Sequence, residues 1–266
     1  MTRFIRFRCR HGDRWGVAPQ NGETVRLVEG SVYGPDWEAG AAVGALADLE
    51  LLPPCEPRTV AALAYNYKDL VGPREQYDEP LVFLKSPSCI IGTESPIGIP
   101  EWVDRVWMEV ELAVVIGKPL FEASRDEAAR GILGVTIAND VTASNVCGRD
   151  HHLARSKSLQ SFCPVGSDLW AGLDTDSLRM TTTINGRRTQ CGSTSSRIMD
   201  EADSVALVSR MVQLLPGDLV LTGTPAGAMD SVVRPGDRVE LEIESIGRLS
   251  NPICERSKER TWPVCS

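Results

Sequence analysis

The sequence of 266 residues has no long hydrophobic run and no surplus of positive charge. Its longest apolar stretches fall far short of the ~20 residues that a membrane-spanning helix needs. The 28 Lys and Arg residues are outnumbered by 36 Asp and Glu residues, which gives a net charge of −8. An acidic chain is poorly suited to nucleic acid or to an anionic membrane surface, so we expect neither partner. Residues 1–16 contain basic residues and no apolar core, and do not predict a signal peptide.

Histidine is also scarce, and the cysteines lack metal-binding spacing. The chain has three histidines, and its eight cysteines include no C-x-x-C pair. Reduced thiols in a cytoplasmic protein are a simpler interpretation of these scattered cysteines than a disulfide framework. Because histidines are few and the cysteines are scattered, any metal site in this chain has to be built from oxygen.

Turn and strand signals divide the chain into three parts. Residues 1–54 alternate polar and apolar side chains around an Asn-Gly turn and predict a small β-rich N-terminal appendage. The proline-rich stretch 51–58 marks a boundary. Residues 57–253 form the main domain, and residues 254–266 form a polar tail.

The main domain has many strand signals but only two clear helices. The helical segments are 123–134, where Ser124 and Glu127 have capping-box spacing, and 199–215, with apolar residues at helical intervals. A hairpin is predicted about Asn185-Gly186. This pattern favours a strand-rich α+β fold, a β-sandwich or roll with helical decoration, over a doubly wound α/β fold.

The segment 106–119, VWMEVELAVVIGKP, reads as one strand that is apolar on both faces but carries two carboxylates on one of them. Glu109 and Glu111 share that face with Ala113 and Val115. A second series of glutamates, in 239–244, alternates cleanly with apolar residues and is typical of a half-exposed strand. Glu109 and Glu111 instead border a partly buried surface, where two unpaired carboxylates would repel each other and lose hydration.

Something positive therefore has to lie between Glu109 and Glu111. A hard divalent cation, which takes carboxylate oxygens at about 2.0–2.1 Å in the case of Mg²⁺, is the economical solution. The alternative is an Arg or Lys that pairs with both glutamates. Asp140, at the end of the apolar segment 134–140, is the candidate for a third ligand. An aspartate that opens an Asx-turn is the alternative there.

Several motifs occur together in a fixed order along the chain. They are WMEVELAVVIGK, GILGVTIANDVTA, ARSKSLQSFCPVG, TINGRRTQCGST, and LLPGDLVLTGTPAG followed by VRPGDRVELEIESIGRLSNPI. Over residues 57–253 this series resembles the fumarylacetoacetate hydrolase family. That family includes C–C hydrolases of acylpyruvates, oxaloacetate decarboxylases, and isomerases or tautomerases of unsaturated 2-oxo acids. The resemblance implies a mixed β-roll with a short β-rich extension, a homodimer, and one bound Mg²⁺ or Mn²⁺.

The resemblance also assigns roles to residues by matching position. Glu109, Glu111 and Asp140 would be the metal ligands. Lys157 would be the catalytic lysine, for which an ordinary surface lysine is the alternative. Thr224 would contact the substrate carboxylate, although it could equally be a plain turn residue. The remaining residues expected to bind substrate are Tyr65, Asn66, Tyr67, Lys85 and Gly223.

Two segments depart from the family pattern. Where its hydrolases and oxaloacetate decarboxylases usually carry a His and, three residues later, a Glu, this chain has Leu70 and Pro73. Neither can move a proton, and Glu75 lies close by in sequence. After Asp140, an Arg and a Gln of many members are replaced by Ser144 and Cys147. Several charged or titratable residues follow, and we interpret them as a solvated loop. The alternative is that one of them replaces the missing charge or base. They are Arg149, Asp150, His151, His152 and Arg155.

The resemblance thus implies a Mg²⁺- or Mn²⁺-dependent enzyme that acts on a 2-oxo or β-keto carboxylate through a metal-stabilised enolate. An ammonium group on Lys157 would add electrostatic stabilisation of the developing oxyanion. Because water attack most needs a general base, the missing His–Glu pair favours decarboxylation or isomerisation over C–C hydrolysis. C–C hydrolysis of an acylpyruvate-type substrate, and binding of metal and ligand without catalysis, are the alternatives.

Overall fold

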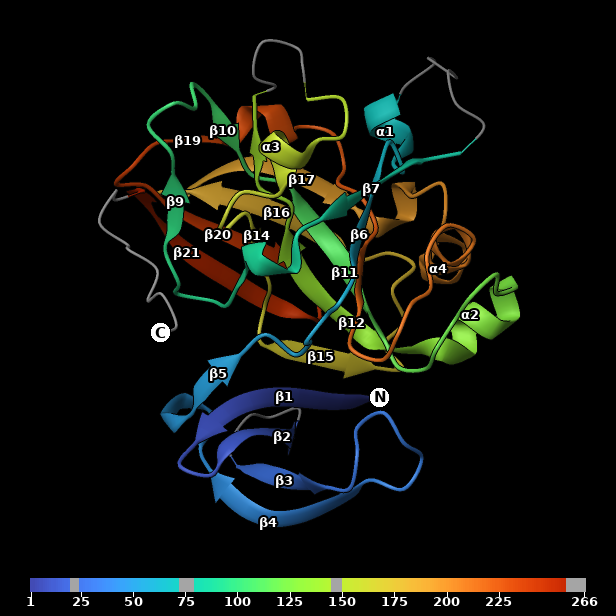
Figure 1. Ribbon diagram of the computed structural model, residues 1–266. Helices are drawn as coiled ribbons and strands as arrows, with labels where there is room; N and C mark the ends of the chain where they lie inside the picture. The colour runs from blue at the N-terminus through green and yellow to red at the C-terminus, as the bar shows by residue number, and fades with distance from the viewer. Residues whose placement is uncertain (20–23, 72–78, 145–149, 257–266) are drawn as a thin grey trace, which may run out of the picture.

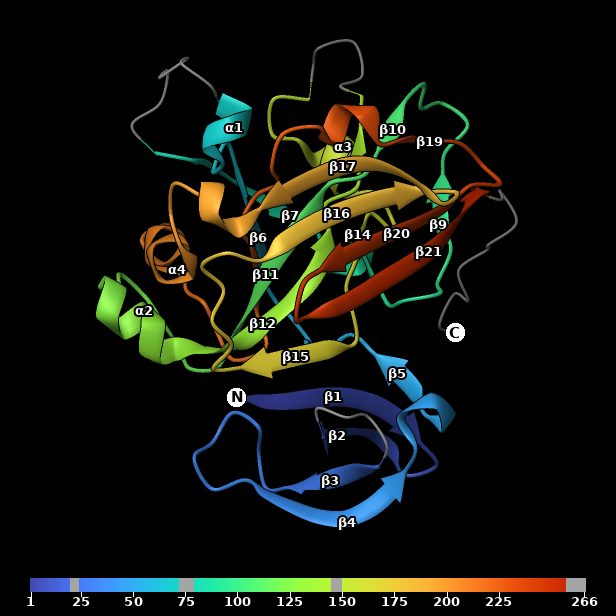
Figure 2. The same cartoon turned by 180° about the vertical axis from the view of Figure 1, so that it is seen from behind.

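The computed structural model describes residues 1–19, 24–71, 79–144 and 150–256. Most of these residues lie in strands, and the few short helices lie at the periphery (Figure 1, and from behind in Figure 2). The prediction of a strand-rich α+β roll with a β-rich N-terminal appendage is confirmed. No described helix is long and apolar enough to cross a membrane.

The N-terminal appendage is built from the first five strands. Ile5, Phe7, Ala18 and Val25 form a small core of its own, whereas Phe4 packs into the main core. The side chains of strand β1 therefore face both cores. The strands are β1 (Thr2–Cys9), β2 (Gly12–Ala18), β3 (Val25–Glu29), β4 (Glu38–Gly44) and β5 (Glu50–Leu52).

The main sheet continues from the appendage without a break. Strand β1 pairs antiparallel with β15, and the order from there is β15, β12, β11, β18, β6, β7. Strands β18 and β6 run parallel to each other, and β7 forms the outer edge. The bounds are β15 (Asp168–Ala171), β12 (Ile132–Asn139), β11 (Val110–Ile116), β18 (Leu219–Leu221), β6 (Val60–Ala64) and β7 (Leu81–Lys85).

A second sheet covers the main one, with the strand order β17, β16, β20, β21, β9. Its bounds are β17 (Arg187–Ser193), β16 (Arg179–Ile184), β20 (Arg238–Ile243), β21 (Gly247–Glu255) and β9 (Ile97–Ile99). The predicted Asn-Gly hairpin joins β16 to β17, and Asn185 and Gly186 have φ of 49° and 79°. Positive φ at both positions is what a two-residue hairpin turn of type I′ requires.

Short pieces complete the fold. Strands β8 (Ile90–Ile91) and β14 (Cys163–Pro164) pair in parallel, while β10 (Val106–Trp107) lies between β13 (Thr142–Ala143) and β19 (Val232–Val233). The α-helices are α1 (Lys68–Val71), α2 (Arg125–Gly131), α3 (Ala154–Lys157) and α4 (Glu201–Ser209). The 3₁₀ turns are η1 (Leu46–Asp48), η2 (Pro87–Cys89), η4 (Thr194–Ser196) and η5 (Ala228–Asp230).

Both predicted helices exist, but the second is shorter than its periodicity suggests. The Ser124–Glu127 capping box at the start of α2 is formed. Helix α4 ends at Ser209, well before residue 215. Glu122 donates its backbone N–H to the Ser209 carbonyl, and the Ser209 hydroxyl accepts from Ala123 N–H. The segment just before α2 thus occupies the Ser209 carbonyl, which a longer α4 would need for its own hydrogen bond.

The expected single strand 106–119 is split into β10 and β11. Between them, Met108 donates its N–H to the Ser231 carbonyl, and Glu109 donates its N–H to the Asn139 side chain at 3.1 Å. These bonds replace ladder bonds and lead β10 away into a different sheet. Glu109 therefore lies in the break, one residue before β11, while Glu111 lies within it.

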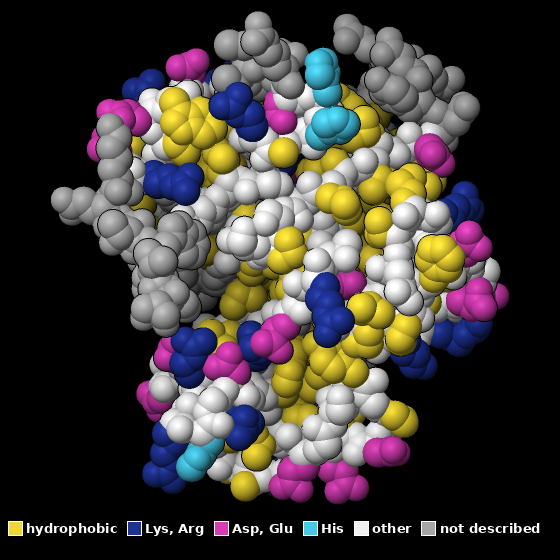
Figure 3. All heavy atoms as spheres, in the orientation of Figure 1, with side chains coloured by type: hydrophobic (Ala, Val, Ile, Leu, Met, Phe, Trp, Pro, Cys, Tyr) yellow, Lys and Arg dark blue, Asp and Glu magenta, His cyan; other side chains and the backbone are white. Residues whose placement is uncertain are grey.

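The two glutamate series behave as differently as their patterns predict. Every residue of β11 is buried, and Glu111 is only 1% exposed. In β20, Glu240 and Glu242 are partly exposed and alternate with buried Val239, Leu241 and Ile243. The face shown in Figure 3 likewise mixes charges of both signs, with hydrophobic side chains gathered through its middle.

Buried Asp218 ties the entry of β6 to the entry of β18. Its Oδ1 accepts from the N–H groups of Arg58 and Thr59, both at 2.8 Å, and its Oδ2 accepts from Leu215 N–H at 2.7 Å. The start of β18, whose far end carries the loop with Gly223 and Thr224, is thereby anchored next to β6.

We predict that Asp218→Ala lowers the free energy of unfolding by about 3 kcal/mol, because three partly buried N–H groups would lose their acceptor. Urea denaturation measures the loss. Asp218→Asn keeps one carbonyl oxygen, so its free energy of unfolding should lie between those of Asp218→Ala and the wild type. Asp230→Ala, at an exposed aspartate, is the control and should stay within about 0.5 kcal/mol. Equal stability of all variants would contradict the anchoring role.

Candidate active site

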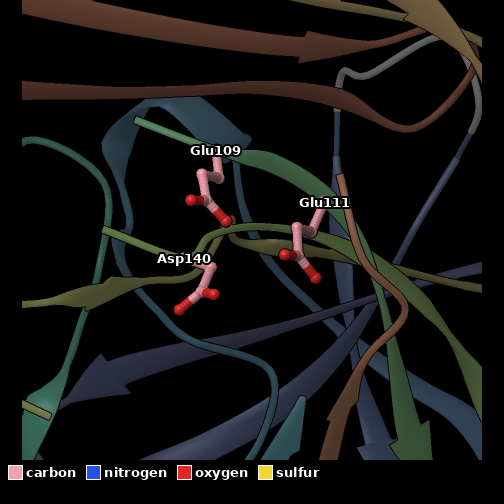
Figure 4. Close-up of side chains that lie close together, drawn as sticks. All are labelled: Glu109, Glu111 and Asp140. Atoms are coloured by element: carbon pink, nitrogen blue, oxygen red, sulfur yellow. The ribbon is translucent and has the colours of Figure 1, made fainter. Parts of the chain in front are cut away.

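Three carboxylates converge where β11 and β12 meet. Val110 pairs with Asn139 across these strands, so Glu109 and Asp140 are the next residues beyond that pair and face each other. Asp140 N–H bonds the Glu109 carbonyl at 3.0 Å. One oxygen from each of Glu109, Glu111 and Asp140 lies within 4.8 Å of the others, and Figure 4 shows the three carboxylates gathered together.

Glu109 is held in this position by neighbouring side chains. Its Oε1 accepts from the Trp107 indole N–H at 2.8 Å and from the Thr142 hydroxyl at 2.9 Å. Its Oε2 accepts from the Lys157 ammonium at 2.9 Å. The carboxylate is thus oriented before any ligand arrives.

Two buried lysines reach the same cluster from other elements. Lys157, at the end of α3, donates to Asp140 Oδ2 at 2.5 Å as well as to Glu109. Lys85, at the end of β7, donates to Asp140 Oδ1 at 2.5 Å and to the backbone carbonyl of Lys157. The Nζ of Lys157 also lies 5.3 Å from the centre of the Phe83 ring. Lys85, Asp140 and Lys157, which are far apart in sequence, thereby form one ionic network.

Burial and mutual charge shift the ionisation of this cluster. Burial, and then the negative charges of Asp140 and Glu109, raise the pKa of Glu111 well above its ordinary value. Burial also disfavours the charged form of Asp140, but the ammonium groups of Lys157 and Lys85 outweigh it and hold its pKa below the ordinary value. Burial opposes the ammonium form of Lys157, yet Asp140 and Glu109 raise its pKa.

The donor set fits a hard divalent cation. All three groups offer carboxylate oxygens, the ligands that Mg²⁺ and Mn²⁺ prefer. Burial first, and then the charges of Asp140 and Glu109, raise the pKa of Glu111 despite the nearby Lys157 ammonium, and a cation among the carboxylates would favour its ionised form. The alternative of a lysine partner is realised for Glu109 and Asp140, whereas Glu111 accepts from the backbone N–H of Gly223 at 2.7 Å.

The loop after β18 forms a second wall beside the carboxylates. Gly223 has φ of +92°, and a Cβ there would lie 3.1 Å from the Leu63 carbonyl, so the close approach to Glu111 requires glycine. Thr224 follows and is 6% exposed. Its hydroxyl accepts from the side-chain amide of Gln190 at 2.9 Å. Sequence reasoning missed Gln190, although the TINGRRTQCGST motif contains it.

The segment 65–67 divides into an exposed and a buried part. Tyr65 is 46% exposed and has φ of +64°, an uncommon conformation for a bulky residue. Asn66 is fully buried, where its amide donates to the carbonyls of Met199 and Thr222 and accepts from Met199 N–H. Tyr67 is also fully buried and donates its hydroxyl to the Met180 sulfur. Contact of these residues with substrate stays a prediction, and Asn66 and Tyr67 brace the wall that Tyr65 borders.

Two sequence profiles together match most of the chain. The profile of the fumarylacetoacetate hydrolase C-terminal domain matches residues 59–254, well over half of the protein. The chain belongs to the fumarylacetoacetate hydrolase family. A second profile, of the N-terminal domain of Rv2993c-like proteins, matches residues 2–54.

Individual members of the fumarylacetoacetate hydrolase family are similar over most of their length. The chain is 40% identical to protein Rv2993c of Mycobacterium tuberculosis over 220 residues, 80% of this chain and 82% of that protein. It is 31% identical to the oxaloacetate tautomerase YisK of Bacillus subtilis over 234 residues, 82% and 78% of the two chains. The crystal structure of a 2-hydroxyhepta-2,4-diene-1,7-dioate isomerase from Mycobacterium marinum aligns with a TM-score of 0.86 and 34% identity, covering 97% of this chain and 100% of that one.

The departures from the fumarylacetoacetate hydrolase pattern are only partly described by the structure. Leu70 lies on α1 and is 39% exposed, and Ser144 donates its backbone N–H to the Arg105 carbonyl. Among the residues after Asp140, buried Asp150 accepts from the Ser156 backbone and hydroxyl, His151 and His152 are exposed, and Arg155 lies over the Trp102 ring at 5.4 Å. Pro73, Glu75, Cys147 and Arg149 lie outside the described residues.

Proposed function

We propose that this protein is a divalent-metal-dependent enzyme that interconverts keto and enol forms, or double-bond isomers, of a small 2-oxo carboxylate. The charge balance of the buried cluster carries the proposal. When all groups are ionised, three carboxylates and the ammonium groups of Lys85 and Lys157 leave one net negative charge. A divalent cation would convert this to one net positive charge, which suits a carboxylate ligand and the enolate formed from it.

Each group of the cluster has a role in this proposal. A Mg²⁺ or Mn²⁺ ion held by Glu109, Glu111 and Asp140 would supply Lewis-acid polarisation of the 2-oxo group. Lys157 would stabilise the negative charge that develops on the enolate oxygen, and its burial strengthens that attraction. Lys85 would hold Asp140 and the end of α3 in place. Thr224 would donate a hydrogen bond to the substrate carboxylate.

The choice of isomerisation over hydrolysis rests on Leu70. Water attack on a carbonyl needs a general base, and a leucine at the position of the usual histidine cannot serve as one. Keto–enol conversion moves a proton from C3 to the enolate oxygen, which solvent water can carry, and it needs the enolate to be stabilised, which the cluster is suited to do. The names of YisK and of the M. marinum protein suggest oxaloacetate and 2-hydroxyhepta-2,4-diene-1,7-dioate as the first substrates to try. Decarboxylation of a β-keto carboxylate passes through the same enolate and is the second candidate.

Product analysis by proton NMR tests the proposal. Oxaloacetate, the dienoate and an acylpyruvate are each incubated in D₂O with protein and Mg²⁺, with protein and EDTA, and with Mg²⁺ alone. We expect accelerated exchange at C3 of oxaloacetate or double-bond migration in the dienoate, only where protein and Mg²⁺ are both present. The control without protein removes the contribution of free Mg²⁺.

Other products would point elsewhere. Pyruvate formed faster than with Mg²⁺ alone would identify a decarboxylase, and two carboxylic fragments from the acylpyruvate would identify a hydrolase. No change in any tube, together with a Mg²⁺-dependent rise in melting temperature in the presence of oxalate, would identify a binding protein. A homodimer, a cytoplasmic location and the lack of nucleic-acid or membrane partners stay predictions.

A further inference from the structure

The hydroxyl group of Thr224 accepts a hydrogen bond from the protein but donates none to the residues that the structure describes. A threonine hydroxyl can donate one hydrogen bond and accept two. The Nε2 of Gln190 donates to Thr224 Oγ1 at 2.9 Å, so one lone pair of that oxygen is in use. Within residues 1–19, 24–71, 79–144 and 150–256, no acceptor takes the proton of the Thr224 hydroxyl. The hydroxyl is therefore an acceptor toward the protein, and its proton is left for something else.

Gln190 can make this bond in only one orientation of its amide. Its Nε2 also donates to the Pro225 carbonyl at 2.8 Å, and its Oε1 accepts from the Thr182 hydroxyl at 2.9 Å. A flipped amide would bring its oxygen against the Pro225 carbonyl, with no proton between them. Thr182 is fully buried and lies directly opposite Gln190 in the β16–β17 ladder. The hairpin thus presents an N–H, never a carbonyl, to Thr224.

We propose that Gln190 is a positioning residue that makes Thr224 an obligatory hydrogen-bond donor toward a carboxylate bound beside the Glu109–Glu111–Asp140 cluster. The inference rests on the proposed function, since it assumes that a carboxylate binds there. Thr224 directly follows Gly223, whose backbone N–H bonds Glu111 of the cluster. An ionised carboxylate is an acceptor only, and it therefore matches the unused proton of the Thr224 hydroxyl.

Gln190→Met tests the proposal because it removes both amide hydrogens at nearly constant volume and adds no charge. The freed hydroxyl would then lose its fixed orientation. We expect the KM for oxaloacetate to rise roughly 10-fold. The dissociation constant of oxalate, measured calorimetrically with Mg²⁺, should rise by the same factor, which corresponds to the free energy of one charge-assisted hydrogen bond. Because Gln190 does not touch the reacting atoms, kcat should change less than about 3-fold.

A double-mutant cycle separates positioning from general support of the fold. Thr224→Val should weaken oxalate binding by a similar factor, and Gln190→Met should cause no further loss in that background. Thr224→Ser keeps the hydroxyl, so Gln190→Met should retain its full effect there. Thr182→Val removes the hydroxyl that fixes the orientation of the Gln190 amide but leaves the amide in place. This variant replaces Gln190→Met if Gln190→Met does not fold. We expect it to weaken oxalate binding by a smaller factor, and to cause no further loss in the Thr224→Val background.

The outcomes distinguish the failure of this inference from the failure of the proposed function. Losses that add in the double variant, or a fall in Mn²⁺ affinity without oxalate, would show that Gln190 merely supports the structure. Oxalate binding unchanged in Gln190→Met would also overturn the inference while the proposed function stands. A wild-type protein that binds no oxalate with Mg²⁺ and turns over no 2-oxo acid would overturn both.

Discussion

We expect Mg²⁺ or Mn²⁺ to raise the melting temperature of the wild-type protein, and Glu111→Gln to abolish that rise and to lower turnover roughly 10³-fold. The neutral amide can still accept from Gly223 N–H, but it loses the charge that a cation needs. At a concentration of 100 Kd, a bound ion stabilises the folded state by about 2.7 kcal/mol. For a chain of this size that corresponds to a shift of roughly 5–10 °C in calorimetry.

The metal-free protein should respond in the opposite direction. Repulsion by Asp140 and Glu109 contributes to the raised pKa of Glu111, so an amide there should leave the metal-free melting temperature unchanged or higher. Glu240→Gln is the matched control, since Glu240 belongs to the half-exposed glutamate series on β20. It should keep both the metal-induced shift and turnover. A full metal-induced shift in Glu111→Gln would remove Glu111 from the ligand set.

Lys157→Gln is expected to separate metal binding from catalysis. Turnover should fall roughly 10²- to 10³-fold, because the charge beside the developing oxyanion is lost. Affinity for Mn²⁺, measured by calorimetry, should be retained or should increase. The reason is that Lys157 Nζ lies 2.9 Å from Glu109 and 2.5 Å from Asp140, where it competes with a cation for the same carboxylates.

Lys118→Gln, at an exposed lysine, is the control for this variant and should change neither property. If Lys157→Gln loses metal affinity and turnover together, the lysine serves to assemble the carboxylates rather than to stabilise charge. If turnover is unchanged while metal still binds, charge stabilisation by Lys157 is excluded.

The carboxylate cluster could be anticipated from sequence because local pattern determines it. Glu109 and Glu111 interrupt a segment that is otherwise apolar on both faces, and Asp140 ends another. Such charges are conspicuous, since burying them is costly without a partner. Lys85 and Lys157 have no such pattern around them, and their meeting at Asp140 spans 55 and 17 residues of sequence. Their place was suggested only by the family resemblance.

Contacts between distant elements also explain what the sequence did not reveal. The break at Met108 and Glu109 depends on Ser231 and on the Asn139 side chain, and the early end of α4 depends on Glu122 and Ala123. A hydrophobic period does not encode such bonds. Gln190 was missed for the same reason, because a glutamine after a hairpin is usually a surface residue and nothing nearby marks it as buried.

The pairing of β1 with β15 covers what would otherwise be an open edge of the main sheet. A chain that lacked the N-terminal appendage would leave β15 with a row of unsatisfied N–H and C=O groups along one side. Exposed strand borders of this kind are templates for pairing with another chain. The appendage thus covers this edge of the main sheet. Its removal would leave every residue of the carboxylate–lysine cluster in the chain, yet yield a protein prone to aggregate.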